Sequence, residues 1–243
     1  MSLPDHSLLS YSIFAVIVLG GMIASYKTGK LSFGASLVGG ILTSFIFFGV
    51  GSIGVSILIA FFILGTGATS WKRKNKISLG LEEANHGQRD AWQVLANAGL
   101  AAILGFLCLL FPAYTGLFSV MTAAAFAAAT SDTLSSELGN IYGRRYYNIL
   151  TLKRDQRGLN GVVSIEGSVF GILGATLIAL IYCVAVSEWK SFLIILISGC
   201  IGNIIDSVLG ASLERKGYLN NNAVNFINTT AGGFTALILF LLF

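Results

Sequence analysis

Charged residues are scarce in this sequence. Only 11% of its 243 residues are Asp, Glu, Lys or Arg, whereas hydrophobic residues make up 55%. A soluble domain carries about 25% charged residues, so an ordinary soluble globular protein and a disordered chain are both excluded. Proline is also rare, with two residues, whereas glycine is abundant, with 29. This composition indicates an all-α polytopic membrane protein.

Cysteine and histidine are also few. The three cysteines, Cys108, Cys183 and Cys200, each lie inside an apolar run. Their odd number and their spacing exclude a disulfide-rich secreted domain and a cysteine metal site. Two histidines are too few for a His-rich metal site. The net charge of +4 does not indicate a nucleic-acid binder, because Lys and Arg gather in short loops between long uncharged stretches, as membrane topology requires.

Long uncharged runs predict eight membrane-spanning helices. No Asp, Glu, Lys or Arg occurs in the 41 residues between Lys30 and Lys72, in the 41 between Asp90 and Asp132, or in the 27 after Lys216. A spanning helix needs about 20 residues, so each 41-residue run holds two. The predicted spans are 8–26, 31–48, 52–70, 91–111, 115–137, 164–187, 191–211 and 225–243. We expect one integral membrane domain, 1–243, with a peripheral first helix and a site formed mainly by 65–228.

The basic residues predict the orientation of these helices. Fourteen of the 15 Lys and Arg residues fall in four loops on one side of the membrane, and Lys190 alone lies on the other. The positive-inside rule places the four basic loops in the cytoplasm. We therefore expect an integral protein of the cell (inner or cytoplasmic) membrane, with both termini outside and an active site that faces the cytoplasm.

Polar side chains gather at the helix ends that adjoin the basic loops. In the segment 88–97, Asp90, Gln93 and Asn97 are spaced three and four residues apart, so they share one helix face. Ionisable groups at membrane depth are costly and usually functional, so we expect a site where five such helix ends meet. The other four polar segments are 130–139, 158–167, 202–211 and 221–228.

Carboxylates, glycines and cations at the same end of the helices suit a polyphosphate with Mg²⁺. Mg²⁺ binds one or two carboxylates plus phosphate oxygens, and we expect Asp132, Glu137 and Asp206 to be its ligands. Asp132 and Glu137 are about 140° apart on an ideal helix, so they converge only if the helix unwinds or if they face different partners. Glycines at a helix N-terminus let backbone N–H groups reach phosphate, which favours Gly158 and Gly161. Lys and Arg neutralise charge during phosphoryl transfer, which favours the cations of the basic loops, including Lys72, Lys74, Arg89 and Arg144.

Neutral and cationic donors form a second expected group. Carboxamides next to Arg89 donate hydrogen bonds without adding negative charge, so they suit a monophosphate that lies beside an anionic nucleotide. The expected acceptor-binding residues are Gln93, Asn97, Asn222 and Asn225.

Three segments resemble the motifs of one known family. The strings DTLSSELG at 132–139, GNIIDSVLGA at 202–211 and QRDAWQVLAN at 88–97 are similar to motifs of the DUF92 / transmembrane protein 19 family. The resemblance runs from about Gly65 to Asn228. It implies a polytopic enzyme, because the family includes the plastid phytyl-phosphate kinase of tocopherol synthesis. The activity it implies is NTP-dependent phosphorylation of a prenyl monophosphate to the diphosphate.

The resemblance also assigns residues. The positions that fall on the family pattern are Arg89, Gln93, Asn97, Asp132, Ser136, Glu137, Asn203, Asp206, Ser207 and Asn225. With them we expect Asp132, Glu137, Asp206 and Arg89 to be catalytic. The expected nucleotide- and phosphate-binding set is Lys72, Lys74, Ser136, Arg144, Gly158, Asn160, Gly161, Ser164, Asn203 and Ser207. The sequence departs from the pattern at Leu159 and Val162, which replace two positions of a glycine-rich GTNGGVS-like string of the family, and at Glu214, where Gln is expected.

Three functions remain as hypotheses. The first is an NTP-dependent phosphotransferase that acts on a prenyl phosphate, with Mg²⁺ as cofactor and CTP or ATP as co-substrate. Its expected partners are the prenyl phosphate, the nucleotide and membrane lipid, with oligomers allowed and no nucleic acid. The second is a CTP-dependent lipid-alcohol kinase or cytidylyltransferase. The third is a lipid-phosphate transporter or scramblase, although transporters usually place polar groups near the bilayer midplane rather than at one face.

Overall fold

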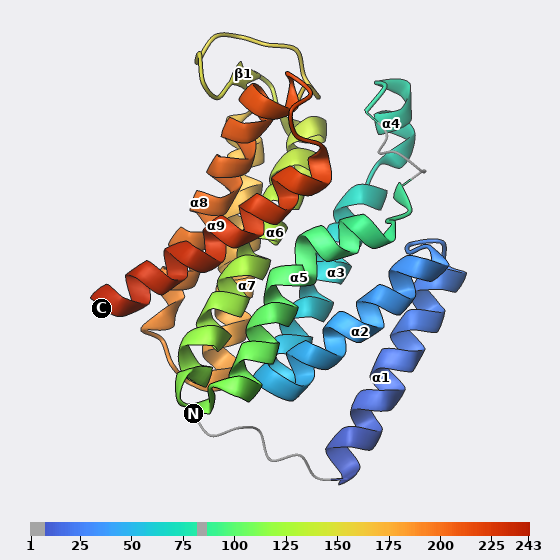
Figure 1. The fold of residues 1–243 in the computed structure, drawn as a ribbon. Helices are drawn as coiled ribbons and strands as arrows, with labels where there is room; N and C mark the ends of the chain where they lie inside the picture. Colours follow the sequence, from blue (N-terminus) through green and yellow to red (C-terminus); the bar gives the residue numbers. More distant parts are fainter. Residues whose placement is uncertain (1–7, 82–86) are drawn as a thin grey trace.

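The computed structural model describes residues 8–81 and 87–243, and it is built almost entirely of helices (Figure 1). Eight of the described helices are long and apolar enough to cross a membrane, which confirms the predicted number. They are α1 Leu8–Lys27, α2 Phe33–Val50, α3 Ser52–Ser70, α5 Ala91–Leu110, α6 Thr115–Tyr142, α7 Ile165–Val186, α8 Ser191–Leu209 and α9 Asn221–Leu242.

Short elements that hydropathy did not predict join these helices. They are the helix α4 Arg73–Ser78, the 3₁₀ turn η2 Pro112–Tyr114, the π-helical turn η3 Gly210–Glu214, and the strands β1 Tyr147–Asn148 and β2 Val162–Val163. The two strands pair antiparallel, with Tyr147 opposite Val163. All but η2 lie at the end of the bundle that carries the basic loops, which is the upper end in Figure 1.

Two spanning helices continue beyond their predicted ends. α6 reaches Tyr142 instead of residue 137, and α9 begins at Asn221 instead of residue 225. Hydropathy locates only the apolar part of a span, whereas the extensions 138–142 and 221–224 include the polar residues Asn140, Asn221 and Asn222. The α9 extension is stabilised by Asn220, whose side-chain oxygen accepts a hydrogen bond from the N–H of Ala223 at 2.9 Å, as an N-cap does. These extra turns carry polar side chains toward the site.

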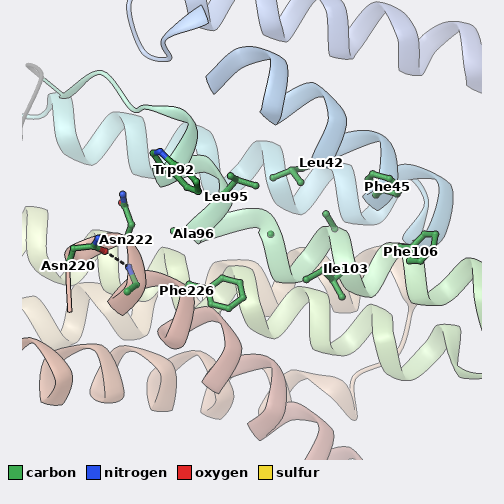
Figure 2. Close-up of a pocket in the computed structure, with 13 residues that line it drawn as sticks. Leu42, Phe45, Trp92, Leu95, Ala96, Ile103, Phe106, Asn220, Asn222 and Phe226 are labelled. Carbon is green, nitrogen blue, oxygen red and sulfur yellow. Dashed lines mark hydrogen bonds between the residues drawn. The ribbon is translucent and has the colours of Figure 1, made fainter. Parts of the chain in front are cut away.

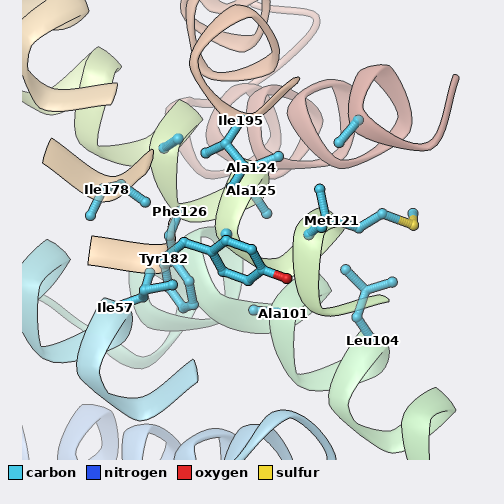
Figure 3. Close-up of a cluster of buried hydrophobic side chains, with 14 of the residues drawn as sticks. Ile57, Ala101, Leu104, Met121, Ala124, Ala125, Phe126, Ile178, Tyr182 and Ile195 are labelled. Carbon is cyan, nitrogen blue, oxygen red and sulfur yellow. The ribbon is translucent and has the colours of Figure 1, made fainter. Parts of the chain in front are cut away.

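α6 is the central helix of the bundle. It contacts α3, α5, α7, α8 and α9, and its alanine-rich segment 123–129 is completely buried. Small side chains at helix contacts let backbones approach closely in a membrane. A Cβ added at Gly232 of α9 would lie 2.8 Å from the Cβ of Ala128. Phe126, the one large side chain of this segment, and Tyr182 of α7 belong to the same buried cluster (Figure 3).

The contact between α2 and α5 depends on two facing glycines. A Cβ added at Gly49 would overlap the carbonyl oxygen of Gly105, and one added at Gly105 would overlap the backbone of Phe45. The two helices therefore touch backbone to backbone, and neither glycine position has room for a side chain.

We expect Gly49→Val to destabilise the protein by about 1–3 kcal/mol or more, because overpacked contacts force backbone shifts. The matched control is Gly34→Val in the same helix, where an added Cβ meets nothing within 4 Å. Thermal unfolding of the detergent-solubilised protein measures the difference. Equal losses of Tm in the two variants would contradict the close contact.

α1 lies at the edge of the bundle (Figure 1). Its main contact is α2, where the ring of Phe14 stacks on Phe47 with centroids 3.9 Å apart. Ser25 is its only buried residue. Most of α1 is therefore an apolar surface suited to lipid.

Exposed aromatic residues mark both ends of the bundle. Trp71 and Trp92 lie at the end with the basic loops, and Tyr114 and Trp189 lie at the opposite end. Tyr and Trp are enriched at both membrane–water interfaces. Their positions agree with helices that span the bilayer.

Candidate functional site

Two polar cavities adjoin each other at the end of the bundle with the basic loops. The first, here called the loop cavity, has a volume of about 200 Å³ and lies between α6, α8, the start of α7 and the loop 143–164. The second, the carboxamide cavity, has about 110 Å³ and lies between the starts of α5 and α9 and the polar end of α6. Asp132, Ser136 and Asn221 line both. Asp132 therefore stands in a shared wall.

Asp132 of α6 and Asp206 of α8 form a carboxyl pair in this wall. Their side chains lie within hydrogen-bonding reach of each other, and Asn228 of α9 lies within the same reach of Asp206. Among the described residues, the buried Oδ1 of Asp206 has no hydrogen-bond partner. Two adjacent carboxylates repel unless they share a proton or bind a cation. The pair and its unpartnered oxygen fit a Mg²⁺ ion, which takes one or two carboxylates and completes its shell with phosphate oxygens and water.

Glu137 does not join this pair. It is 7% exposed and forms a salt bridge with Lys76 of α4. The same ammonium donates hydrogen bonds to the carbonyl oxygens of Ala68 at 2.7 Å and Thr69 at 3.2 Å. α6 is helical through this region, so the five-residue spacing turns Glu137 to a different side of the helix from Asp132.

The predicted Mg²⁺ site of three carboxylates is therefore not assembled. Within residues 8–81 and 87–243, no three His, Cys, Asp or Glu side chains are grouped to hold a metal ion. Asp132 and Asp206 remain the candidate ligands, and Glu137 belongs to the salt bridge with Lys76.

The expected nucleotide- and phosphate-binding residues divide into two groups. The described geometry brings seven of them into the loop cavity with Asp132 and Asp206, and it leaves the three cations outside. The seven are Ser136, Gly158, Asn160, Gly161, Ser164, Asn203 and Ser207. Leu159, Val162 and Glu214, where the sequence departs from the family motifs, line the same cavity, so the departures change the site itself.

The loop cavity is shaped by close backbone contacts. Gly161 has a φ of +70°, and a Cβ there would overlap the backbone nitrogen of Ala211 in η3, so only glycine fits. Ser164 caps α7 by accepting a hydrogen bond from the N–H of Gly167 at 3.1 Å. The N-terminus of the 22-residue α7 thus opens onto the cavity, where N–H groups and the helix dipole favour an anion.

Asn203 holds α8 against α6. Its Nδ2 donates a hydrogen bond to Ser131 Oγ at 3.1 Å, and its Oδ1 accepts one from Ser135 Oγ at 3.3 Å. Both ends of the carboxamide are therefore used between the helices. This arrangement places Asp206, three residues further along α8, beside Asp132.

The three predicted cations lie elsewhere. The Nζ of Lys72 lies 4.7 Å from the centroid of the Tyr142 ring, and Lys74 is exposed. Arg144 is also exposed, and only its backbone N–H approaches the carboxylate of Glu166, at 3.4 Å.

Other cations gather in a third cavity that the sequence analysis did not identify. This basic cavity, of about 100 Å³, lies between residues 28–30, the end of α3, α4 and α6. Lys30, Arg73, Lys76 and Arg89 line it together with Glu137. The sequence placed these cations in the right loops, but it gave no signal for the pairing of Lys76 with a residue 61 positions away.

The carboxamide cavity collects most of the predicted acceptor-binding residues. Arg89, Gln93, Asn97 and Asn225 line it, together with the shared Asp132. Gln93 closes a capping box in which its Oε1 accepts from the N–H of Asp90 at 2.9 Å, so this box leaves its NH₂ group unused. The Nδ2 of Asn97 donates to the carbonyl oxygen of Gln93 at 2.9 Å. The start of α5 is thereby a rigid row of polar groups.

Asn222, the remaining residue of that predicted set, lies apart from it. It stands with Asn220 at the polar end of an apolar groove between α2, α5 and α9 (Figure 2). The groove has a volume of about 900 Å³ and is lined by side chains such as Phe45, Ile103 and Phe226. It shares no residue with the carboxamide cavity.

Two residues that were not predicted from the sequence, Tyr146 and Arg215, hold the loop 143–164. The hydroxyl of Tyr146 lies 2.9 Å from the carbonyl oxygen of Gly143, and Tyr146 lines the loop cavity. Arg215, beyond η3, donates from Nε to the carbonyl oxygen of Asn160 at 2.6 Å and from a terminal nitrogen to Asp155 at 2.8 Å. The N–H of Gln156 and the Arg215 guanidinium hold the pKa of Asp155 below its usual range.

We expect Arg215→Ala to loosen the loop with little loss of global stability, because an exposed ion pair contributes little to it. Tryptic cleavage at Arg154 and Arg157 should become several-fold faster, whereas Lys216→Ala should leave it unchanged. Since the pKa of Asp155 is lowered, the link holds at neutral pH and is lost as the pH falls through that lowered value. Unchanged cleavage in Arg215→Ala would contradict this role.

Comparisons with known proteins agree with the motifs. The family model described as integral membrane protein DUF92 matches residues 16–233. The chloroplast protein VTE6 of Arabidopsis thaliana is 32% identical over 197 residues, which are 78% of this chain and 59% of that protein, so the match spans less than two thirds of the relative. An uncharacterized membrane protein of Methanocaldococcus jannaschii is 34% identical over 234 residues, 96% of this chain and 94% of the relative. Protein PGR of Arabidopsis thaliana is 27% identical over 93% of this chain and 95% of its own length. No solved structure matches the chain.

Proposed function

The chain belongs to the DUF92 family of integral membrane proteins, and from this premise we propose that it is a prenyl-monophosphate kinase. It transfers a phosphoryl group from an NTP, CTP or ATP, to a phytyl-, geranylgeranyl- or farnesyl-phosphate-like acceptor and produces the prenyl diphosphate. The likeness to VTE6 and the motifs at 88–97, 132–139 and 202–211 support a function related to prenyl phosphates.

The observation that carries the proposal is the wall that the loop cavity and the carboxamide cavity share. The loop cavity offers a helix N-terminus and the Asp132–Asp206 pair, which suit the phosphates of a nucleotide. The carboxamide cavity offers Arg89 and carboxamide donors, which suit a monophosphate. Two phosphorylated ligands in these cavities meet at Asp132, as a direct transfer requires.

The chemistry needs little beyond positioning. An oxygen of the acceptor phosphate attacks the γ-phosphorus of the NTP, the bond from that phosphorus to the β–γ bridging oxygen breaks, and NDP leaves. Because the acceptor is already an anion, no strong general base is required. Arg89 and the α7 N-terminus stabilise the negative charge on the phosphates. Mg²⁺, held by Asp132 and Asp206, would supply further charge neutralisation.

The location of the site suits a lipid substrate. The prenyl chain of the acceptor belongs in the bilayer and its phosphate at the interface, whereas the nucleotide comes from water. We propose that the site faces the cytoplasm and that both termini lie outside, because 14 of the 15 basic residues lie in loops at the site's end of the bundle.

The decisive experiment is a purified-protein assay with labelled NTP against a panel of prenols and prenyl phosphates. A labelled prenyl diphosphate is the expected product. A labelled prenyl monophosphate or a cytidylylated lipid would instead establish the lipid-alcohol kinase or the cytidylyltransferase. Flux of lipid phosphate across proteoliposomes without nucleotide consumption would establish the transporter.

We expect Asn97→Ala and Asn225→Ala to weaken use of the prenyl phosphate by about tenfold to a hundredfold, because each removes a half-buried donor of the cavity that contributes about 1–3 kcal/mol. The KM for the acceptor should rise while nucleotide binding stays unchanged. Asn222→Ala, on the separate groove, is the matched control. If the two variants weakened nucleotide binding and left the acceptor KM intact, the roles of the two cavities would be reversed.

A further inference from the structure

An apolar cavity of about 300 Å³ lies between α1, α2, α3 and α5. Ile17 and Val18 of α1 and Val55, Leu58 and Phe62 of α3 supply part of its apolar wall. A cavity of this size is at the lower end of those that hold small molecules, so it suits one hydrocarbon chain better than two.

One end of this cavity is polar. Arg89, Gln93 and Asn97 line it, and the same three residues line the carboxamide cavity. An apolar space and a polar space thus meet at one row of side chains on and just before α5.

Arg89 is fixed at this junction. Its backbone N–H donates to the carbonyl oxygen of Lys30, and its own carbonyl oxygen accepts from the N–H of Ser32, both at 3.0 Å. Its guanidinium carbon lies 5.4 Å from the centroid of the Phe61 ring. A guanidinium held in place at the mouth of an apolar cavity matches a phosphate attached to a hydrocarbon chain.

We propose that this cavity holds the isoprenoid chain of the acceptor, with its phosphate on Arg89, Gln93 and Asn97. This inference rests on the proposed function. The larger groove of Figure 2 is the less suitable place, because it shares no residue with the carboxamide cavity. The isoprenoid chain and the phosphate of a single molecule must occupy adjoining spaces. Of the two apolar cavities, the one behind α1 shares residues with the carboxamide cavity and the larger groove does not.

α1 forms the membrane-facing wall of the cavity. It is attached mainly to α2, where Met22 fills the space beside Gly40. Its surface is otherwise exposed to lipid. The isoprenoid chain of the acceptor therefore enters sideways from the bilayer, past this weakly attached helix.

Two adjacent glycines of α1 provide a matched test. Gly21 lines the cavity and Gly20 does not, and an added Cβ meets nothing within 4 Å at either position. We expect Gly21→Phe to lower kcat/KM for geranylgeranyl phosphate by about tenfold and to leave kcat/KM for dimethylallyl phosphate within about twofold. Gly20→Phe should change neither. Equal effects of Gly21→Phe on the long and the short acceptor would overturn the proposal.

Photo-crosslinking separates this inference from the kinase proposal. A geranylgeranyl phosphate analogue with a diazirine on its distal isoprene unit should label α1 and α3, and Gly21→Phe should abolish the label. Labelling there without formation of diphosphate would retain the chain site and refute the kinase. Formation of diphosphate with labelling at Phe45, Ile103 or Phe106, or with no labelling of α1 and α3, would retain the kinase and overturn the chain site.

Discussion

Asp206→Asn and Asp132→Asn should each reduce phosphoryl transfer by about a thousandfold while the protein remains folded and inserted. Each substitution removes one charge from the carboxyl pair that we propose binds Mg²⁺, and the loss of one electrostatic stabiliser of the transition state typically costs 10²–10³ in rate. Asp206→Asn should also abolish the Mg²⁺ dependence of nucleotide binding, which a titration with fluorescent nucleotide measures.

A carboxylate at the same end of the bundle provides the control. Glu166 lies in the first turn of α7 and does not line the loop cavity. Glu166→Gln should therefore keep turnover within a few-fold of the wild-type protein. Near-normal turnover in both aspartate variants would remove the metal site and, with it, the proposed place of the nucleotide.

Glu137→Gln should act on stability first. The substitution leaves the ammonium of Lys76 buried without its counter-ion, and breaking a buried ion pair costs about 3–5 kcal/mol. Thermal unfolding in detergent should show the largest loss of Tm among the carboxylate variants.

A double variant distinguishes this structural role from a catalytic one. Replacing both partners of a buried ion pair by apolar residues is often neutral or stabilising, so Lys76→Met with Glu137→Leu should recover most of the stability that either single change loses. Lys74→Met, on the exposed face of the same α4, should have little effect. If the double variant were no more stable than the single variants, the salt bridge would not be what holds α4 on α6.

The number and limits of the spanning helices could be predicted well from the sequence. Long apolar runs with few charges predicted the eight spans, because a membrane requires about 20 apolar residues for each. Hydropathy did not predict the helix ends that carry polar residues, since α6 continues to Tyr142 and α9 starts at Asn221. These turns are stabilised by caps and by contacts with neighbouring helices, which leave no trace in hydropathy.

Many residues of the candidate site could be predicted from the sequence, but not which of them the fold brings together. Helical spacing placed Gln93 and Asn97 on one face of α5, and both line the carboxamide cavity. Whether a carboxylate joins a neighbour on another helix depends on packing between segments far apart in the chain. Glu137 shows this, because its partner Lys76 comes from a short helix that the sequence analysis did not predict. The prediction that Lys72 and Arg144 lie in the nucleotide site was wrong for the same reason.

In the proposed kinase, the wall between the two polar cavities determines the order in which the two substrates bind and leave. Because Asp132 borders both cavities, the two proposed ligands can fill neighbouring spaces at the same time, and neither has to leave before the other arrives. We therefore expect turnover of the proposed kinase to pass through a ternary complex, which gives intersecting lines in double-reciprocal plots. Exchange of one ligand for the other would instead give ping-pong kinetics. In the proposed kinase no side chain has to carry the phosphoryl group, because the cavities assigned to donor and acceptor lie on either side of Asp132.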